Sequence, residues 1–253
     1  MAGKQKLKPD IVLKNYWNGN EEFADFFNAV LFRGKQIIQP DELEEVDTEG
    51  STVLEHREYA ESVQASRDNI KIQKKSTGLG VRLVMLGLDH QEHIHYAMPL
   101  RVMGYDYATY KKQYDSNARK YADAKGLTED EYLSKLRQAE KVGPGITVIG
   151  YYGEKPWDGA KSLHEMLNLP EDVAEFINDY PMHLVEARNT ELIFHNKNNR
   201  DLFELLQIFL NRSASGNSIA DAAVKYNDDH MPDKIVFMAV AGAIKIKIDN
   251  HVY

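Results

Sequence analysis

The sequence contains no cysteine among its 253 residues. Disulfide bonds and cysteine-ligated zinc or iron–sulfur sites are therefore excluded, and the chain suits a reducing compartment, so we expect a cytoplasmic location. Long hydrophobic runs are also missing. The longest, residues 235–244, is far shorter than the roughly 20 residues that cross a bilayer. Residues 1–6 are basic but lack the apolar stretch of a signal peptide. We expect neither a membrane span nor a leader.

Positive charge is in the minority, with 31 Lys and Arg against 39 Asp and Glu and a net charge of −8. Such a chain does not bind polyanions indiscriminately, so a nucleic-acid partner has to meet a local basic surface. The sequence also has no Gly-x-Gly-x-x-Gly fingerprint, no complete P-loop and no Gly-x-Ser-x-Gly elbow. These absences remove dinucleotide binding, nucleotide hydrolysis and serine-hydrolase chemistry from the expected functions.

The first part of the chain predicts helices followed by strands. Apolar residues recur at helical spacing through residues 21–32, with Asn20 as the N-cap. Residues 54–66 are polar, with apolar positions about a turn apart, and predict a second helix. Residues 68–73 and 81–89 predict a β-hairpin across a glycine-containing turn. The second strand is apolar at nearly every position, which is typical of the middle of a sheet.

The later part of the chain alternates helices with one further strand. Helices are predicted over residues 105–123 and 128–142, the second opening with the Thr-x-x-Glu spacing of a capping box. Residues 143–145, Gly-Pro-Gly, are expected to stop that helix, and residues 146–152 predict a buried strand. The remaining predicted helical or apolar segments are residues 163–167, 172–178, 200–210, 219 onward and 235–248. This order predicts an α/β fold with a mixed central sheet flanked by helices.

Polar residues follow the predicted central strand. Side chains alternate faces along a strand, so Asp89 and Gln91 point the same way and His90 points the opposite way. Asp68 begins the paired strand, so a hairpin would bring its carboxylate to the same rim as Asp89. Hard cations prefer oxygen ligands, so this pair predicts a magnesium site, with manganese or calcium as alternatives. Gln91 would orient water for phosphodiester hydrolysis. Spacing alone favours a plainer interpretation, in which Asp68 caps a strand and Asp89 lies in a solvated loop.

Two nearby histidines suggest a different metal site. His93 and His95 would share the face of Asp89 and Gln91 if the strand continued, and imidazole with carboxylate suits zinc or iron. Two ligands do not complete such a site, so we favour histidines that hydrogen-bond within the fold.

Basic residues that could meet phosphates fall around the hairpin and along one predicted helix: Lys71, Lys74, Lys75, Arg101, Lys111, Lys112, Arg119 and Lys120. Along that helix the lysines alternate with Tyr107, Tyr110 and Tyr114, a pattern that can serve single-stranded nucleic acid by stacking. Burial statistics favour half-buried tyrosines beside solvated lysines instead.

Tyr152 is expected in a packed corner with Tyr151 and Trp157, and a substrate-facing role for Tyr152 is the alternative.

Taken together, several segments carry a family likeness that covers most of the chain. They are Phe23-Ala24-Asp25-Phe26-Phe27-Asn28, Arg67-Asp68, Gly87-Leu88-Asp89-His90-Gln91, His95-Tyr96-Ala97-Met98-Pro99-Leu100-Arg101, Tyr105-Asp106 and Tyr151-Tyr152-Gly153-Glu154-Lys155-Pro156-Trp157-Asp158-Gly159. In this combination the chain resembles the Rpn family of recombination-promoting nucleases and transposases, within the PD-(D/E)xK nuclease superfamily.

The resemblance implies a restriction-endonuclease-like core at residues 18–160 and a mostly helical C-terminal extension at residues 161–253 packed on that core. It also implies a magnesium-dependent DNA endonuclease linked to recombination or transposition. In that enzyme, Asp68 matches the motif aspartate, Asp89 the acidic strand-end residue, and Gln91 the position where other superfamily members carry lysine. Asp89 is one methylene shorter than the family's usual glutamate. Gln91 lacks a positive charge but can orient water through its amide.

The expected partner is DNA, and the candidate DNA-contacting residues are Arg101, Lys74, Lys75 and Tyr152. The expectation is also compatible with a homodimer. Pro40-Asp41-Glu42 imitates the superfamily's name but is typical of a helix entry, because proline and acidic residues favour the first turn. The main alternative function is a catalytically degenerate nuclease fold that serves as a DNA-binding or protein-interaction module. A histidine-based metalloenzyme ranks last.

Overall fold

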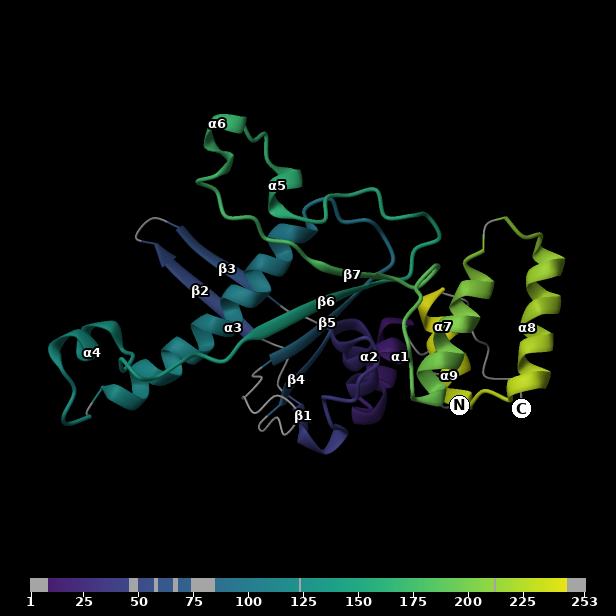
Figure 1. Ribbon diagram of the computed structural model, residues 1–253, viewed down its shortest axis with the longest axis horizontal. Coiled ribbons are helices and arrows are strands. Elements are labelled where there is room, and N and C mark those ends of the chain that lie inside the picture. Colours follow the sequence, from purple (N-terminus) through teal and green to yellow (C-terminus); the bar gives the residue numbers. More distant parts are fainter. Residues whose placement is uncertain are drawn as a thin grey trace, which may run out of the picture.

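The computed structural model describes residues 9–45, 50–56, 59–65, 68–73, 85–122, 124–211 and 213–244, with the backbone alone for residues 9, 10 and 50–65. An open five-stranded sheet runs through its centre (Figure 1). Its strands, in spatial order, are β1 (Leu43–Glu45), β4 (Asn69–Gln73), β5 (Met85–Gln91), β6 (Gly145–Tyr151) and β7 (His183–Glu186). The β1–β4 and β4–β5 pairs are antiparallel, whereas β5–β6 and β6–β7 are parallel. The predicted α/β class is confirmed, and β5 is the middle strand as expected.

Helices cover both faces of this sheet (Figure 1). One face carries the main hydrophobic core, to which β5 contributes Leu86 and Leu88. The helices that supply most of that core are α1 (Pro9–Trp17), α2 (Asn20–Phe32), α7 (Lys197–Phe209) and α9 (Lys234–Ala243). On the opposite face α3 (Met98–Tyr121) packs Met98 and Val102 into a smaller cluster with Ile149 of β6. The alternation of side chains along β5 and β6 therefore assigns each residue to one of two layers.

Helix α2 forms as predicted, with Phe23, Phe26 and Phe27 buried in the main core. The predicted N-cap is wrong: Gly19 holds that position, and Asn20 is the first helical residue. The side chain of Asn20 is engaged elsewhere, because its amide donates to the carbonyl oxygens of Pro40 and Leu43. It thereby ties the start of α2 to the edge of the sheet.

Residues 54–66 are not helical, contrary to the prediction. They belong to a two-stranded antiparallel hairpin of β2 (Gly50–His56) and β3 (Tyr59–Ala65), in which His56 pairs with Tyr59. The apolar residues of this segment are too few to establish a helical period, and β-branched residues such as Thr52 and Val63 favour strands. The hairpin connects β1 with β4, outside the main sheet.

The second predicted helix after the central strand is shorter than expected. The capping box of Thr128 and Glu131 is present, but α4 (Glu129–Ser134) ends when Lys135 adopts a left-handed conformation. The helix therefore stops well before Gly143, which was expected to end it. Pro40-Asp41-Glu42 forms the short 3₁₀ turn η1 (Pro40–Glu42), with its proline in the first turn as predicted.

The C-terminal part of the chain contributes to the sheet as well as to the helical layer. It contains the short helices α5 (Leu163–Met166) and α6 (Glu171–Ala174), then β7, and finally α7, α8 (Gly216–His230) and α9. The strand β7 and the helix α1 were not predicted. Within the described part of the chain, every helix is too short or too polar to traverse a lipid bilayer.

The strand β4 buries polar rather than apolar side chains: Asn69, Lys71 and Gln73 are each almost inaccessible to solvent. The Lys71 ammonium group donates to the carbonyl oxygen of Asn18 at 2.6 Å and also to the side chain of Asn20. Burial lowers the pKa of Lys71. Because Asn69 and Lys71 donate to residues 14–20, around the α1–α2 connection, they fix the position of β4 beneath the helices.

Candidate active site

The register of β4 and β5 brings the two predicted carboxylates together. Asn69 pairs with Leu88, so continuing this antiparallel register by one residue places Asp68 across from Asp89. Oδ2 of Asp68 accepts a hydrogen bond of 2.8 Å from the backbone N–H of His90, the residue after Asp89. Asp68 is therefore held at the end of the central strand, as the sequence predicted.

Asp89 is only 3% exposed, and both of its carboxylate oxygens accept hydrogen bonds. The amide of Gln91 donates to Oδ1 at 3.0 Å, since residues two apart on a strand share a face. The hydroxyl of Tyr105 donates to Oδ2 at 2.9 Å, and the guanidinium of Arg101 lies 3.4 Å from the same oxygen. The predicted residues Asp68, Asp89, Gln91 and Arg101 thus meet at one end of β5.

The pKa of Asp89 is raised to about 6. Burial is the largest cause, and the negative charge of Asp68 adds to it. Arg101, Tyr105 and Gln91 act in the opposite direction, because each stabilises the ionised carboxylate. The site therefore holds two neighbouring carboxylates whose mutual repulsion is only partly relieved by protein groups.

Helix α3 positions Arg101 and Tyr105 over the end of β5. Met98 and Pro99 are buried at its start, and Val102 packs against the sheet, so this turn of the helix is anchored. Arg101 and Tyr105 are four residues apart and lie on the same side of the helix, where the guanidinium donates to the tyrosine hydroxyl. The side chain of Arg101 remains 36% exposed, so part of it faces solvent at the rim of the site.

Tyr105 was absent from the predicted site residues. Burial and the charge of Asp89 raise its pKa above the usual value, so its hydroxyl stays protonated and acts as a donor to Asp89. The sequence does carry a signal for it: an arginine and a tyrosine in i, i+4 spacing open the helix that follows the acidic strand. That signal identifies a pair on one helix face but not the carboxylate that the pair meets.

The two carboxylates fit a magnesium ion in their chemistry. Magnesium is usually held by one or two carboxylates, with water and substrate phosphate completing its octahedral shell. Asp68 and Asp89 supply carboxylates of this kind, and the amide oxygen of Gln91 is a further hard ligand nearby. No group of three or more acidic or histidine side chains suited to a metal occurs among the described residues. Most of the shell would therefore come from solvent and substrate.

The condition for a histidine metal site is not met, because β5 ends at Gln91. The side chain of His93 is 87% exposed, and its ring lies 3.7 Å from the carboxylate of Glu92. His90 points to the opposite face of the sheet from Asp89, as predicted. Its ring there lies within hydrogen-bonding distance of Asn69, at 3.1 Å, and of the Tyr152 hydroxyl, at 3.3 Å.

Tyr152, a further DNA-contact candidate, lies on the other face of the sheet from the Asp89 carboxylate. Tyr152 is 3% exposed and packs in the main core, so it offers almost no surface to a nucleic acid, and burial raises its pKa. Its neighbours Tyr151 and Trp157 do form the expected packed corner, with ring centroids 5.2 Å apart. Lys74 and Lys75 lie outside the described residues.

Comparison with known proteins finds no relative of this chain. The chain matches no protein-family model, and no curated protein or solved structure matches it significantly.

Proposed function

We propose that this chain is a magnesium-dependent phosphodiester hydrolase that cuts DNA, with a restriction-endonuclease-like core. The observation that carries the proposal is the cross-strand pair of Asp68 and Asp89 at the end of the central strand, with Gln91 on the same face. A carboxyl group whose pKa is raised by burial and by a neighbouring carboxylate, as that of Asp89 is, is a feature of metal and catalytic sites. The resemblance to recombination-promoting nucleases supports DNA as the substrate.

In this proposal, Asp68 and Asp89 hold the ion, which when bound lowers the pKa of a water molecule and neutralises charge on the phosphate. The amide of Gln91 orients the attacking water, because a glutamine can donate and accept at once. Arg101 turns its exposed guanidinium edge to a phosphate oxygen, which suits its planar, forked donors. Tyr105 keeps the Asp89 carboxylate in place through its hydrogen bond.

Plasmid nicking tests the proposal. Purified protein should nick supercoiled DNA with magnesium and stop on addition of EDTA, and Asp68→Asn should reduce the rate at least a hundredfold. Asp221→Asn, which changes an exposed aspartate on α8, is the matched control and should cut at the wild-type rate. Equal rates for the Asp68 variant and the wild type would exclude the assignment.

A DNA-binding module without catalysis is the second candidate. It is favoured by one observation: both oxygens of Asp89 already accept hydrogen bonds from protein donors, and an arginine lies beside them. A carboxylate whose negative charge is already met by protein donors and an arginine has less need of an external metal. Titration of labelled DNA without divalent metal distinguishes the two: tight binding, with no cutting under magnesium or manganese, supports the module.

A further inference from the structure

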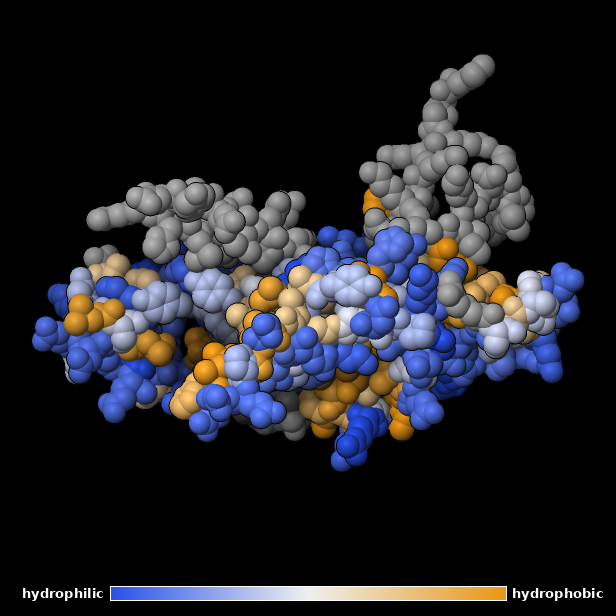
Figure 2. All heavy atoms as spheres, turned by 90° about the horizontal axis from the view of Figure 1, so that it is seen from above, coloured by the Kyte–Doolittle hydropathy of each residue, from blue (hydrophilic) through white to orange (hydrophobic). Residues whose placement is uncertain are grey.

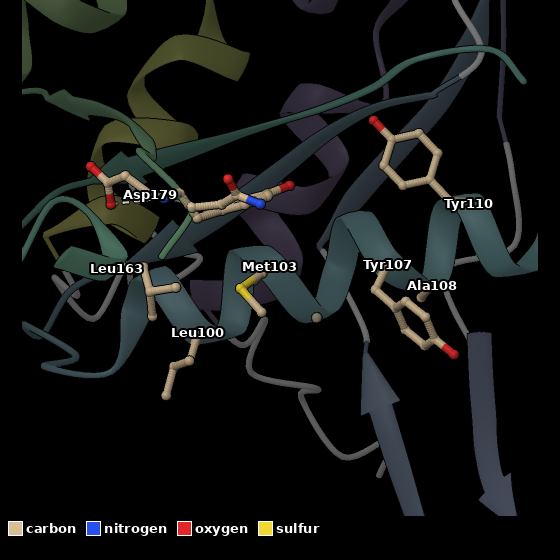
Figure 3. Close-up of a pocket in the computed structure, with 10 residues that line it drawn as sticks. Leu100, Met103, Tyr107, Ala108, Tyr110, Leu163 and Asp179 are labelled. Atoms are coloured by element: carbon tan, nitrogen blue, oxygen red, sulfur yellow. Dashed lines mark hydrogen bonds between the residues drawn. The ribbon is translucent and has the colours of Figure 1, made fainter. Parts of the chain in front are cut away.

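An apolar groove of about 550 Å³ runs along the N-terminal half of α3, away from the carboxylate pair. Helix α3 provides Leu100, Met103 and Tyr107, and Leu163 and Tyr180 line it from the segment that carries α5 and α6. Figure 3 shows Leu100, Met103 and Leu163 close together, with Tyr107 and Tyr110 further along the helix. The groove therefore lies between one long helix and a later segment of the chain.

The groove exposes side chains that normally lie inside a protein. Leu100 is 49% exposed and Met103 is 39% exposed, although both belong to the first turns of a helix that is otherwise anchored to the sheet. Figure 2, which views the molecule from the side of α5 and α6, shows hydrophobic surface broken up by hydrophilic atoms. Exposed apolar side chains that line a groove, with polar residues beside them, are typical of a binding site.

The segment that lines one side of the groove is acidic. Residues 161–180 contain five carboxylates and a single lysine, and each of these carboxylates belongs to an exposed residue: Glu165, Glu171, Asp172, Glu175 and Asp179. Asp179 lines the groove itself. Backbone hydrogen bonds from His164 and Tyr180 contribute to lowering the pKa of Asp179, so its charge persists at neutral pH. An occupant of this groove is therefore selected for positive charge as well as for apolar surface.

We propose that the groove binds a basic amphipathic helix of a partner protein. Such a helix places apolar residues at i, i+3, i+4 and i+7 on one face, with Lys and Arg beside them. The lining residues of α3 extend from Leu100 to Tyr110, about 15 Å along the axis, which matches roughly three turns of a partner helix. Apolar anchors would fill the groove, and the flanking cations would meet the carboxylates of residues 161–180.

The same charges disfavour other occupants. The net negative charge of residues 161–180 would repel the phosphates of DNA or of an anionic membrane. An isologous dimer through this groove would bring the acidic segment of one copy toward that of the other. This site is separate from the proposed hydrolysis of DNA, and its test does not depend on nuclease activity.

Fluorescence anisotropy with a labelled 14-residue helical peptide of leucine and lysine tests this proposal on the full chain. A twin peptide carries glutamate in place of each lysine and keeps the leucines. The lysine peptide should bind, with affinity falling at high salt, and the glutamate twin should bind at least tenfold more weakly. Equal affinity for both peptides, or no binding of the lysine peptide, would overturn the proposal.

Amino-acid substitutions in the chain test whether the peptide binds in the groove. Met103→Asp places a charge in the groove and should weaken binding at least tenfold, whereas Val224→Asp, at an exposed apolar position on α8, should leave it unchanged. Glu171→Lys combined with Glu175→Lys changes only exposed residues of the acidic segment and should shift the preference toward the glutamate peptide. Unchanged binding by both groove variants would contradict the site. So would a concentration-dependent dimer that Met103→Asp dissociates, or an oligonucleotide that displaces the peptide.

Discussion

The hydroxyl of Tyr105 on α3 donates a hydrogen bond of 2.9 Å to Oδ2 of Asp89 at the end of β5. This contact joins the helix on one face of the sheet to the residue on which the proposed chemistry depends. It also accounts for a carboxylate that is buried yet ionised near neutral pH, because buried charges need hydrogen-bonding partners.

Replacing Tyr105 with phenylalanine tests this link. Tyr105→Phe should lower the free energy of unfolding by about 1.5–3 kcal/mol at pH 7.5, since it removes a hydrogen bond to a buried charged group. Urea denaturation measures the effect. Tyr107→Phe, at an exposed position on the same helix, is the control and should change stability by less than about 0.5 kcal/mol. Equal losses in the two variants would contradict the role given to Tyr105.

The raised pKa of Asp89 predicts a pH-dependent difference between the wild type and Asp89→Asn. A carboxyl group whose pKa is higher in the folded state than in the unfolded state contributes stability below the unfolded value, near 4, and loses it as pH rises through about 6. As the pH rises from 4 to 7, the wild type should therefore lose stability relative to Asp89→Asn. The expected change in the difference between their free energies of unfolding is on the order of 2 kcal/mol. Denaturant titrations across this range measure it, and a constant difference would exclude a raised pKa.

The neighbouring carboxylate should be visible in the titration of Asp89. Asp68→Asn removes a negative charge that raises the pKa of Asp89, so this pKa should fall below about 6. NMR titration of the Asp89 carboxyl carbon measures the change. Asp221→Asn, on α8, should leave the value where it is in the wild type. An unchanged pKa of Asp89 in Asp68→Asn would indicate that the two carboxylates are too far apart for the proposed metal site.

Lys71 offers a test of the buried polar face of β4. Lys71→Met keeps most of the side-chain volume but leaves the carbonyl oxygen of Asn18 and the side chain of Asn20 without this donor. We expect a loss of about 2 kcal/mol in the free energy of unfolding, because hydrogen bonds from a charged group typically contribute about 1.5–3 kcal/mol. Lys112→Met on the exposed side of α3 is the matched control for thermal or urea unfolding. Equal stability of the two variants would show that the hydrogen bonds of Lys71 contribute little.

The proposed metal site predicts a competition between protons and magnesium. Metal ligands must be deprotonated, so magnesium affinity should fall as pH drops below the pKa of Asp89, near 6. Isothermal titration calorimetry at pH 5 and pH 7.5 measures this, with Asp89→Asn as the variant that should bind weakly at both values. An affinity that is the same at both pH values would argue that Asp89 is not a ligand.

Local patterns in the sequence were sufficient for several elements of the fold. The apolar run of β5, the phenylalanine stripe of α2 and the capping box that begins α4 each depend on neighbouring residues only, and each is present. The β4–β5 pairing was also predictable, and with it the approach of Asp68 to Asp89, because a hairpin fixes its own register.

Tertiary structure alone decided the rest. The hairpin of β2 and β3, the short strand β7 and the early end of α4 have weak local signals that packing overrides. The same holds within the site. Arg101 and Tyr105 share a helix face by their spacing, but only the packing of Met98 and Val102 against β6 brings that face to Asp89. The burial that raises the pKa of Asp89 likewise arises from segments distant in the chain, so no local pattern could reveal it.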